Sequence, residues 1–296
     1  IKTIETFTEE KDRNLFSKVM ESHQKNPAAN GKILYYLSET FRYPGDLSGL
    51  TFLSQILQGY AMKVATEHWR RNRGRCMGSI YWQFNDNWPV ASWSSMDYYG
   101  RYKALHYMAR VFNESVAGSI CKEGNTMGFW ISNESLKEAA VEMKINLKDL
   151  DFQVLYEESV SGTVAPLSAA DLLTKDFSSY RSRSEQVFVT MEYKVTDKET
   201  GRTEERCEFE TFVPVKHLEL KDPELTVSCQ EDGTVTLSAK SFAPYCMVEG
   251  IHEDIIWDSN VLAMTDGKER VLHPVKGVVP GVKPEIRVYD VYHTYA

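Results

Sequence analysis

Residues 78–110, with the sequence GSIYWQFNDNWPVASWSSMDYYGRYKALHYMAR, carry most of the information about the fold of this chain. The short apolar run over residues 76–84 is bounded by turn residues and predicts a strand buried on both faces. A loop over residues 85–89 ends this run, and apolar residues at helical spacing predict a helix between Tyr102 and Phe112. A buried strand followed by a helix is the rhythm of a parallel α/β unit.

A second helix is predicted upstream of this strand. Apolar residues recur at helical spacing along one of its faces, at Leu50, Leu53, Leu57, Tyr60 and Val64. Gly74 follows three closely spaced arginines and is expected to end the helix. Nearer the N-terminus, Asn30 and Gly31 are expected to interrupt regular structure. The first part of the chain is therefore expected to be helical around one strand.

After about residue 118 the apolar pattern changes to two-residue alternation. One alternating row is Val141, Met143, Ile145 and Leu147, and another is Val187, Val189, Met191, Tyr193 and Val195. Such rows predict antiparallel strands in a β-sandwich, with the polar residues 196–201 as a tip. A linker over residues 214–223 leads to a second all-β unit, where Asp232 and Gly233 predict a hairpin turn. The expected fold class is α/β followed by all-β.

The overall charge is negative, because 42 acidic and 34 basic residues give a formal net charge of −8. That balance argues against nucleic acid and against an anionic membrane surface. No apolar run approaches the roughly 18 residues that a membrane span needs. We therefore expect no nucleic-acid partner and no membrane partner.

The five cysteines are widely spaced without a CxxC pair, and the histidines show no metal-binding spacing. We therefore expect neither a metal site nor a cofactor. Reduced cysteines favour a cytoplasmic location. Two Asn-Glu-Ser triplets, beginning at Asn113 and Asn133, match the glycosylation pattern and leave a lysosomal or secreted location as the alternative.

Aromatic and polar side chains are interleaved where the predicted strand meets its loop. Trp82, Asn85, Asp86 and Trp88 follow one another closely, and Trp93 comes shortly after them. An aromatic ring packs against the C–H face of a sugar, and amides and carboxylates bond its hydroxyls. In α/β barrels, active sites form at the C-terminal edge of the strands. Sugar binding is one interpretation, and an aromatic core beside a polar turn is the other.

This region resembles the last barrel strand and the last barrel helix of glycoside hydrolase family 2, in its β-mannosidase branch. The matching residues are 77–86 (MGSIYWQFND), 88–90 (WPV), 93–95 (WSS), 97–101 (DYYGR) and 103–106 (KALH). The preceding barrel helix of the family is similar to residues 54–58 and 68–70. Its two C-terminal sandwiches are similar to residues 130–134 (WISNE), 257–260 (WDSN) and 264–267 (MTDG). The resemblance covers the whole chain.

The resemblance implies a chain of three parts. Residues 1–117 would be the C-terminal part of a (β/α)8 barrel, residues 118–217 an immunoglobulin-like β-sandwich, and residues 218–296 a second such sandwich. The activity that it implies is exo-acting, retaining hydrolysis of terminal β-D-mannose residues. Two glutamates carry out that reaction, with their carboxyl groups about 5–5.5 Å apart.

Neither catalytic glutamate of the family is expected in this chain. The family's acid/base follows an asparagine after barrel strand four, whereas Glu114 and Glu134 follow asparagines at a helix end and in a sandwich. The nucleophile motif is missing, and residues 38–41 only echo it. Because the chain also opens at Ile1 without a methionine, we expect a piece of a longer enzyme that is inactive alone.

The resemblance also implies substrate-binding residues and partners. Trp82 would be the platform at the subsite next to the cleaved bond, Asn85 and Asp86 would border that subsite, and Trp88 would line its mouth. Two alternatives stay open: Trp88 as a core residue and Asp86 as a loop cap. The expected partners are a β-mannoside oligosaccharide, the missing N-terminal part of the same enzyme and, through an exposed barrel edge, a second copy in a homo-oligomer.

Two other functions fit parts of the pattern. One is a non-catalytic sugar-binding or structural module made of the sandwiches. That module would need an exposed aromatic platform at Trp130 or Trp257, the tryptophans of the sandwich region. The other is an exo-β-glucosaminidase or β-galactosidase relative within the same family.

Overall fold

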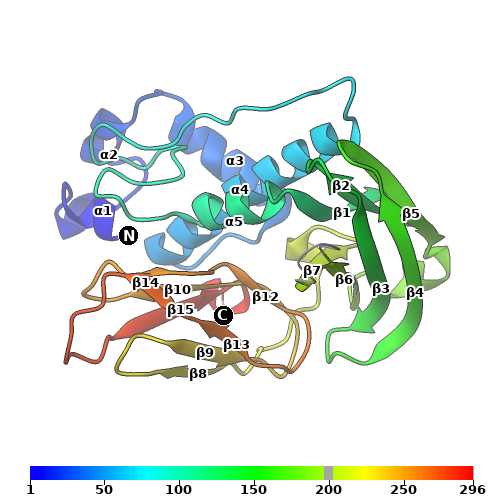
Figure 1. Ribbon diagram of the computed structural model, residues 1–296. Helices are drawn as coiled ribbons and strands as arrows, with labels where there is room; N and C mark the ends of the chain where they lie inside the picture. The colour runs from blue at the N-terminus through cyan, green and yellow to red at the C-terminus, as the bar shows by residue number, and fades with distance from the viewer. Residues whose placement is uncertain (197–202, 296) are drawn as a thin grey trace. The chain divides into compact units, whose positions relative to one another are not determined.

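The computed structural model describes residues 1–196 and 203–295, which form two compact units. One unit combines residues 1–62, 81–109 and 222–296, and the other combines residues 63–80 and 110–221. Figure 1 shows the helices in blue to teal and the strands in green to red. The predicted polar tip lies, beyond Thr196, outside the described residues.

The unit that contains residues 110–221 is built around an antiparallel β-sandwich (Figure 1). One sheet has the order β4-β3-β6-β7 and the other has the order β1-β2-β5. The strands are β1 (Val116–Glu123), β2 (Thr126–Asn133), β3 (Ala139–Asp149), β4 (Val154–Val164), β5 (Ser168–Asp176), β6 (Val187–Thr196) and β7 (Thr203–Thr211). The predicted alternation is confirmed, since Met143 and Tyr193 pair across β3 and β6 and both are only 2% exposed in the core.

The end of helix α4 (Leu47–Arg71) packs on this sandwich through buried ion pairs. Lys63 Nζ lies 2.7 Å from Glu67 Oε1 and 3.0 Å from Glu208 Oε2 on β7. The guanidinium of Arg71 donates to Ser119 Oγ on β1 at 2.9 Å. Burial raises the pKa of Glu67 to about 7, although the charge of Lys63 opposes this effect. The C-terminal end of α4 is therefore attached to the sandwich by its charged side chains.

The other unit begins with the helices α1 (Lys2–Glu5), α2 (Lys18–His23) and α3 (Ala29–Thr40). It also contains the first part of α4 and most of α5 (Ala104–Phe112). The two predicted helices are confirmed as α4 and α5. In α4 the buried face is centred on Phe52, Leu53 and Ile56, so the predicted apolar face is rotated toward these residues.

The predicted interruption at Asn30 and Gly31 is wrong, because both residues lie inside α3. The side-chain amide of Asn30 donates to the carbonyl oxygen of Leu15 at 2.7 Å, and its oxygen accepts from Gln24 Nε2 at 2.8 Å. Asparagine disfavours a helix when its side chain competes for the helix backbone. Here a buried tertiary contact occupies that side chain instead.

Residues 222–295 contain the second β-sandwich, shown in yellow to red in Figure 1. Its sheets have the orders β12-β10-β15 and β13-β9-β8, with β11 and β14 as a separate pair. The strands are β8 (Thr226–Cys229), β9 (Val235–Ser238), β10 (Ala243–Gly250), β11 (Ile256–Trp257), β12 (Leu262–Met264), β13 (Arg270–Leu272), β14 (Pro274–Lys276) and β15 (Ile286–Asp290). The predicted hairpin turn is confirmed between β8 and β9, where Gly233 has a φ of 83° that favours glycine.

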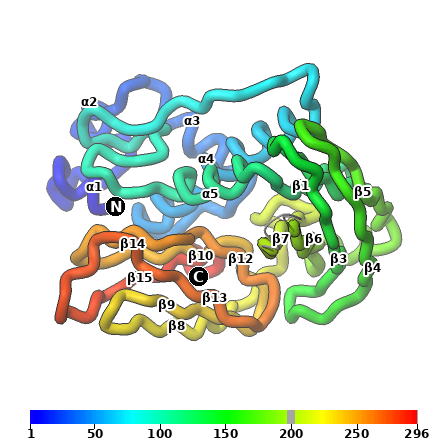
Figure 2. The backbone as a smooth tube through the Cα atoms, viewed as in Figure 1, coloured from blue at the N-terminus to red at the C-terminus, as the bar shows by residue number. Residues whose placement is uncertain are grey.

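The second sandwich packs against the helices of its own unit (Figure 2). The ring of Phe52 on α4 stacks on Tyr289 of β15 with a centroid distance of 5.4 Å. The ring of Phe41 meets Tyr245 of β10 edge-on at 6.5 Å. These aromatic contacts pack the second sandwich against α4 and the end of α3, so segments from the two ends of the chain lie in one unit.

The strand predicted over residues 76–84 is wrong, because these residues belong to none of the sheets among the described residues. Ile80 is 98% exposed, Trp82 73% and Phe84 57%, whereas Tyr81 and Gln83 are half-buried. The side chains thus alternate as in a strand. Backbone bonds from the loop over residues 93–96 form one isolated bridge, between Asn85 and Met96, but in the described part of the chain no strand of a sheet pairs with this run.

Within the described residues, no helix is long and apolar enough to cross a membrane. The division of the chain at 1–117, 118–217 and 218–296 stays a prediction.

Candidate functional site

Residues 81–103 fold back on themselves, so that the exposed run lies beside the loop that contains Ser95. The amide of Ser95 donates to the carbonyl oxygen of Gln83, and the amide of Met96 to that of Phe84, each at 2.9 Å. The hydroxyl of Tyr81 lies 3.2 Å from Ser95 Oγ. Tyr81 and Gln83 therefore face this return of the chain, and the even-numbered residues of the run face away from it.

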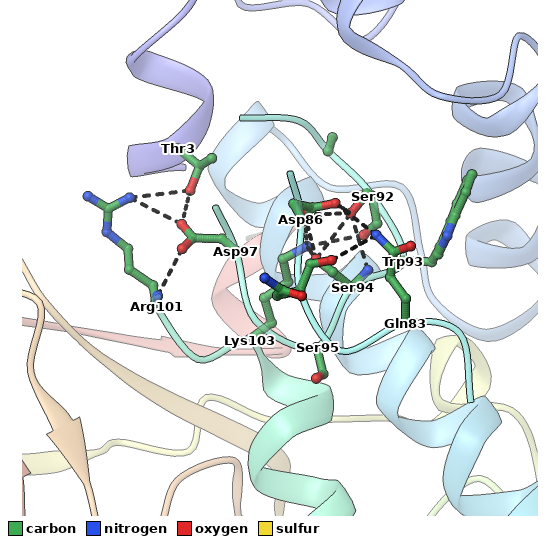
Figure 3. Close-up of polar contacts among 12 residues, drawn as sticks. Thr3, Gln83, Asp86, Ser92, Trp93, Ser94, Ser95, Asp97, Arg101 and Lys103 are labelled. Carbon is green, nitrogen blue, oxygen red and sulfur yellow. Dashed lines mark hydrogen bonds and ion pairs between the residues drawn. The ribbon is translucent and has the colours of Figure 1, made fainter. Parts of the chain in front are cut away.

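Asp86 is the centre of the polar contacts in Figure 3. Its side chain has no exposed surface, and Oδ1 lies 2.8 Å from Nζ of Lys25 in the connection between α2 and α3. Lys103 Nζ lies 3.6 Å from Oδ2, and Gln83 Nε2 donates to Oδ1 at 3.3 Å. One carboxylate thus joins segments that are 61 positions apart in the sequence.

Two serine hydroxyls complete the surroundings of Asp86. Ser92 Oγ lies 2.7 Å from Oδ2, and Ser94 Oγ donates to the same oxygen at 2.5 Å. Burial alone would raise the pKa of Asp86, but hydrogen bonds from Lys25, Ser94 and Ser92 outweigh it and hold the pKa below its usual value. Asp86 is therefore charged at neutral pH and is occupied by protein donors, which is the geometry of a loop cap.

A second carboxylate, Asp97, fixes the far end of the loop (Figure 3). It accepts from the backbone amides of Tyr99 at 2.9 Å and Arg101 at 2.8 Å, and also from the hydroxyl of Thr3. The guanidinium of Arg101 lies 3.1 Å from Asp97 and continues to Asp254 at 2.7 Å. The loop is thereby tied to α1 and to the sandwich of the same unit.

Trp82 and Asn85 are exposed, in contrast to Asp86. The backbone carbonyl of Asn85 accepts from Gln83 Nε2 at 2.9 Å. This bond fixes the main chain at Asn85, while the side chain of Asn85 is exposed to solvent. The peptide bond between Trp82 and Gln83 is cis. A large indole exposed on an anchored backbone is suited to stacking on a ligand.

Trp88 is a surface residue that is held in place, with 39% of its area exposed. Its indole N–H donates to the carbonyl oxygen of His23 at 2.8 Å. Lys25 Nζ lies 4.7 Å from the centre of the ring, in a cation–π arrangement. Trp88 therefore lies beside the Asp86 turn and keeps one part of its ring open to solvent.

The sequence analysis missed the partners that hold this site, namely Lys25, Ser92, Ser94 and Lys103. The two-residue spacing of Ser92 and Ser94 was a usable signal, since it places both hydroxyls on one side of an extended chain. Lys25 left no signal, because only the tertiary fold brings it to Asp86.

Among the described residues, neither a metal centre nor a fully exposed sandwich tryptophan is found. Among residues 1–196 and 203–295, no group of three or more His, Cys, Asp or Glu side chains is arranged to hold a metal ion. Trp257 is 2% exposed and donates to the carbonyl oxygen of Gly233 at 3.0 Å, as a core residue does. Trp130 on β2 is half-buried.

Two domain families match the strand-rich part of the chain. The Mannosidase Ig/CBM-like domain matches residues 125–217. An Ig-fold domain, from a family named for mannosidases, matches residues 220–294. The predicted pair of immunoglobulin-like sandwiches is therefore confirmed.

Curated relatives extend the similarity to the helical part. β-Mannosidase B of Aspergillus clavatus is 28% identical over 309 residues, which cover 95% of this chain and 35% of the relative. The β-mannosidase of Bos taurus is 34% identical over 123 residues, or 37% of this chain and 14% of the relative. The chain thus spans 35% or less of the length of these relatives.

Solved structures share the fold along the whole chain. The β-D-mannosidase of Dictyoglomus thermophilum has a TM-score of 0.82 at 22% identity, covering 98% of this chain and 36% of that one. The exo-chitosanase of Amycolatopsis orientalis has a TM-score of 0.71 at 16% identity, covering 99% and 40%. At these sequence identities the structural similarity indicates a shared fold only. Taken with the domain families and the curated relatives, it confirms the predicted resemblance: along its whole length the chain resembles a C-terminal part of a β-mannosidase of glycoside hydrolase family 2.

Proposed function

We propose that this chain is the C-terminal part of an exo-acting, retaining β-mannosidase that removes terminal β-D-mannose residues from oligosaccharides. The observation that carries the proposal is the indole of Trp82, 73% exposed on a backbone that hydrogen bonds anchor through Gln83. In this proposal Trp82 is the platform at the subsite next to the cleaved bond. Asn85 borders the same subsite with its exposed amide.

Asp86 and Trp88 support that subsite in different ways. The carboxylate of Asp86 is bound by lysine and serine donors, so it borders the subsite by holding the turn rather than by its own sugar contact. Trp88 lines the mouth with the part of its ring that is exposed.

We further propose that residues 1–117 are the remnant of a (β/α)8 barrel, followed by sandwiches over 118–217 and 218–296. The support is the exposed stripe of Ile80, Trp82 and Phe84. A barrel strand has alternate side chains that face the barrel interior and the outer helices. In the whole enzyme, the N-terminal part would supply the strands beside this run and cover the stripe.

The chain alone is proposed to be inactive, because its candidate glutamates are engaged in ion pairs. Arg206 Nη2 lies 2.7 Å from Glu114 Oε1, and Arg73 pairs with Glu134. Glu67 has the raised pKa of a general acid, but it is only 7% exposed and is bound to Lys63. Both catalytic glutamates would come from the N-terminal part.

A partner and a cellular location follow from the same proposal. The N-terminal part of the same enzyme is the partner, and in its absence the exposed stripe favours association with a second copy of the chain. The five cysteines are free thiols, which suits the cytoplasm.

The test is hydrolysis of an aryl β-D-mannoside by the whole enzyme that carries these residues and by the 296-residue chain. We expect turnover by the whole enzyme and none by the chain. In the whole enzyme, Trp82→Ala should lower kcat/KM roughly ten- to hundredfold because the platform is lost. Trp69→Ala, at a tryptophan on α4 that is 38% exposed, is the matched control and should change little.

Two outcomes would contradict the proposal. Equal kcat/KM for Trp82→Ala and the control would remove Trp82 from the subsite. A whole enzyme that hydrolyses an aryl β-D-glucosaminide and leaves the mannoside intact would assign the chain to another substrate within the family.

A further inference from the structure

The last residue of α2 and the connection that follows it bind the loop that carries Trp88, although more than 60 positions separate them in the sequence. His23 holds the loop at two points: its carbonyl oxygen accepts from Trp88 Nε1 at 2.8 Å, and its Nδ1 lies 2.7 Å from the carbonyl oxygen of Pro89. Gln24 Nε2 donates to the carbonyl oxygen of Ala91 at 2.7 Å. These contacts fix the path of the main chain.

Lys25 is the member of this connection that reaches two side chains of the candidate site at once. Its ammonium lies 2.8 Å from the buried carboxylate of Asp86 and 4.7 Å from the ring centre of Trp88. The lysine side chain is itself only 15% exposed, so both interactions take place where water screens them little. Because the Lys25 ammonium contacts both the Asp86 carboxylate and the face of the Trp88 indole, it limits the movement of the Asp86 turn and of the Trp88 ring relative to each other.

We propose that Lys25 is a positioning residue for sugar recognition, which sets the orientation of the Trp88 ring relative to the Asp86 turn. The role of the ring in binding a β-mannoside rests on the proposed function; the role of Lys25 in holding the ring does not. Without the ammonium, the indole keeps its bond to His23 but turns about that edge, and Asp86 keeps its serine and Lys103 donors. Removal of the Lys25 ammonium should therefore change the orientation of the Trp88 ring more than it changes the stability of the fold.

The first experiment replaces Lys25 in the whole enzyme and separates KM from kcat. Lys25→Met retains the aliphatic stem and removes the charge, and it should raise KM for an aryl β-D-mannoside roughly tenfold with kcat changed less than about threefold. Lys25→Arg, which can still pair with the carboxylate and stack on the ring, should recover most of the affinity. Lys32→Met, an exposed lysine on α3, is the matched control. A KM that stays at the wild-type value in Lys25→Met would overturn the proposal.

The second experiment measures the environment of the Trp88 ring by NMR and does not depend on enzyme activity. In the 296-residue chain labelled with 15N-tryptophan, Trp88→Phe assigns the indole N–H resonance of Trp88. That resonance should shift in Lys25→Met, return toward its original position in Lys25→Arg and stay in place in Lys32→Met. An unmoved resonance in Lys25→Met would refute the positioning role even if the whole enzyme hydrolysed no β-mannoside, an outcome that by itself would contradict only the proposed function.

Discussion

Strand β2 and the run over residues 76–84 have similar residues and opposite environments. Each combines a glycine, an isoleucine, a tryptophan and a further aromatic residue within a few positions. In β2 the side chain of Ile131 is fully buried, and the strand is bonded to β1 and β5. In the run, Ile80 is 98% exposed and no sheet among the described residues includes it. Local sequence thus predicts an extended chain, whereas burial depends on partners distant in the sequence.

The polar centres of the two units differ in a related way. Asp86 lies beside the exposed run, and its several donors keep its pKa low despite burial. Glu67 lies against the closed sandwich, where burial dominates and raises its pKa to about 7. The nearby charge of Glu208 also raises the pKa of Glu67, whereas the groups around Asp86 are lysine and serine donors, so the balance of burial and neighbouring groups decides which form the fold favours.

The largest effect is expected from a matched pair of isoleucine substitutions in the 296-residue chain. Ile131→Ala should lower the free energy of unfolding by about 2–5 kcal/mol, because it leaves a cavity in the sandwich core. Ile80→Ala should change it by less than about 0.5 kcal/mol, since the side chain is already exposed to water. Urea titrations of both variants make the measurement. Comparable losses would show that the run is buried in solution.

A smaller effect is expected at the site itself. Asp86→Ala leaves the ammonium groups of Lys25 and Lys103 without their buried partner and should lower the free energy of unfolding by about 2–4 kcal/mol. Asp86→Asn should cost less, because its amide oxygen still accepts from the serine hydroxyls. Both values come from the same urea titrations. If the two variants were equally stable, the charge of Asp86 would have no part in holding the loop.

The smallest effect is a pH dependence that Glu67 contributes to the unit containing the first sandwich. Folded Glu67 keeps its proton up to about pH 7, whereas the unfolded side chain releases it near 4.5. The folded state therefore binds more protons between these values, and the free energy of unfolding should fall as pH rises through them, by up to roughly 3 kcal/mol. Glu67→Gln should remove this part of the slope. Identical slopes for wild type and variant would show that burial does not govern Glu67.

Much of the fold could be predicted from residue spacing. The alternating rows of β3 and β6, the hairpin at Gly233 and the helix α4 all show one-sided burial, and one-sided burial leaves a period in the sequence. The prediction at Asn30 failed because a tertiary contact satisfies its side chain. The prediction over residues 76–84 failed because an apolar run indicates an extended chain but does not reveal whether other strands pair with it.

Taken alone, the sequence determined the two sandwiches, the principal helices and the family resemblance, since each is encoded in local periodicity or in a contiguous motif. It also placed Trp82, Asn85, Asp86 and Trp88 in one short stretch, where the predicted strand meets its loop. Only the tertiary structure decided which of them face solvent, and only it brought Lys25 to the carboxylate of Asp86. The physical reason is that exposure, hydrogen-bond partners and pKa depend on groups that approach through space, and their separation along the chain leaves no pattern to read.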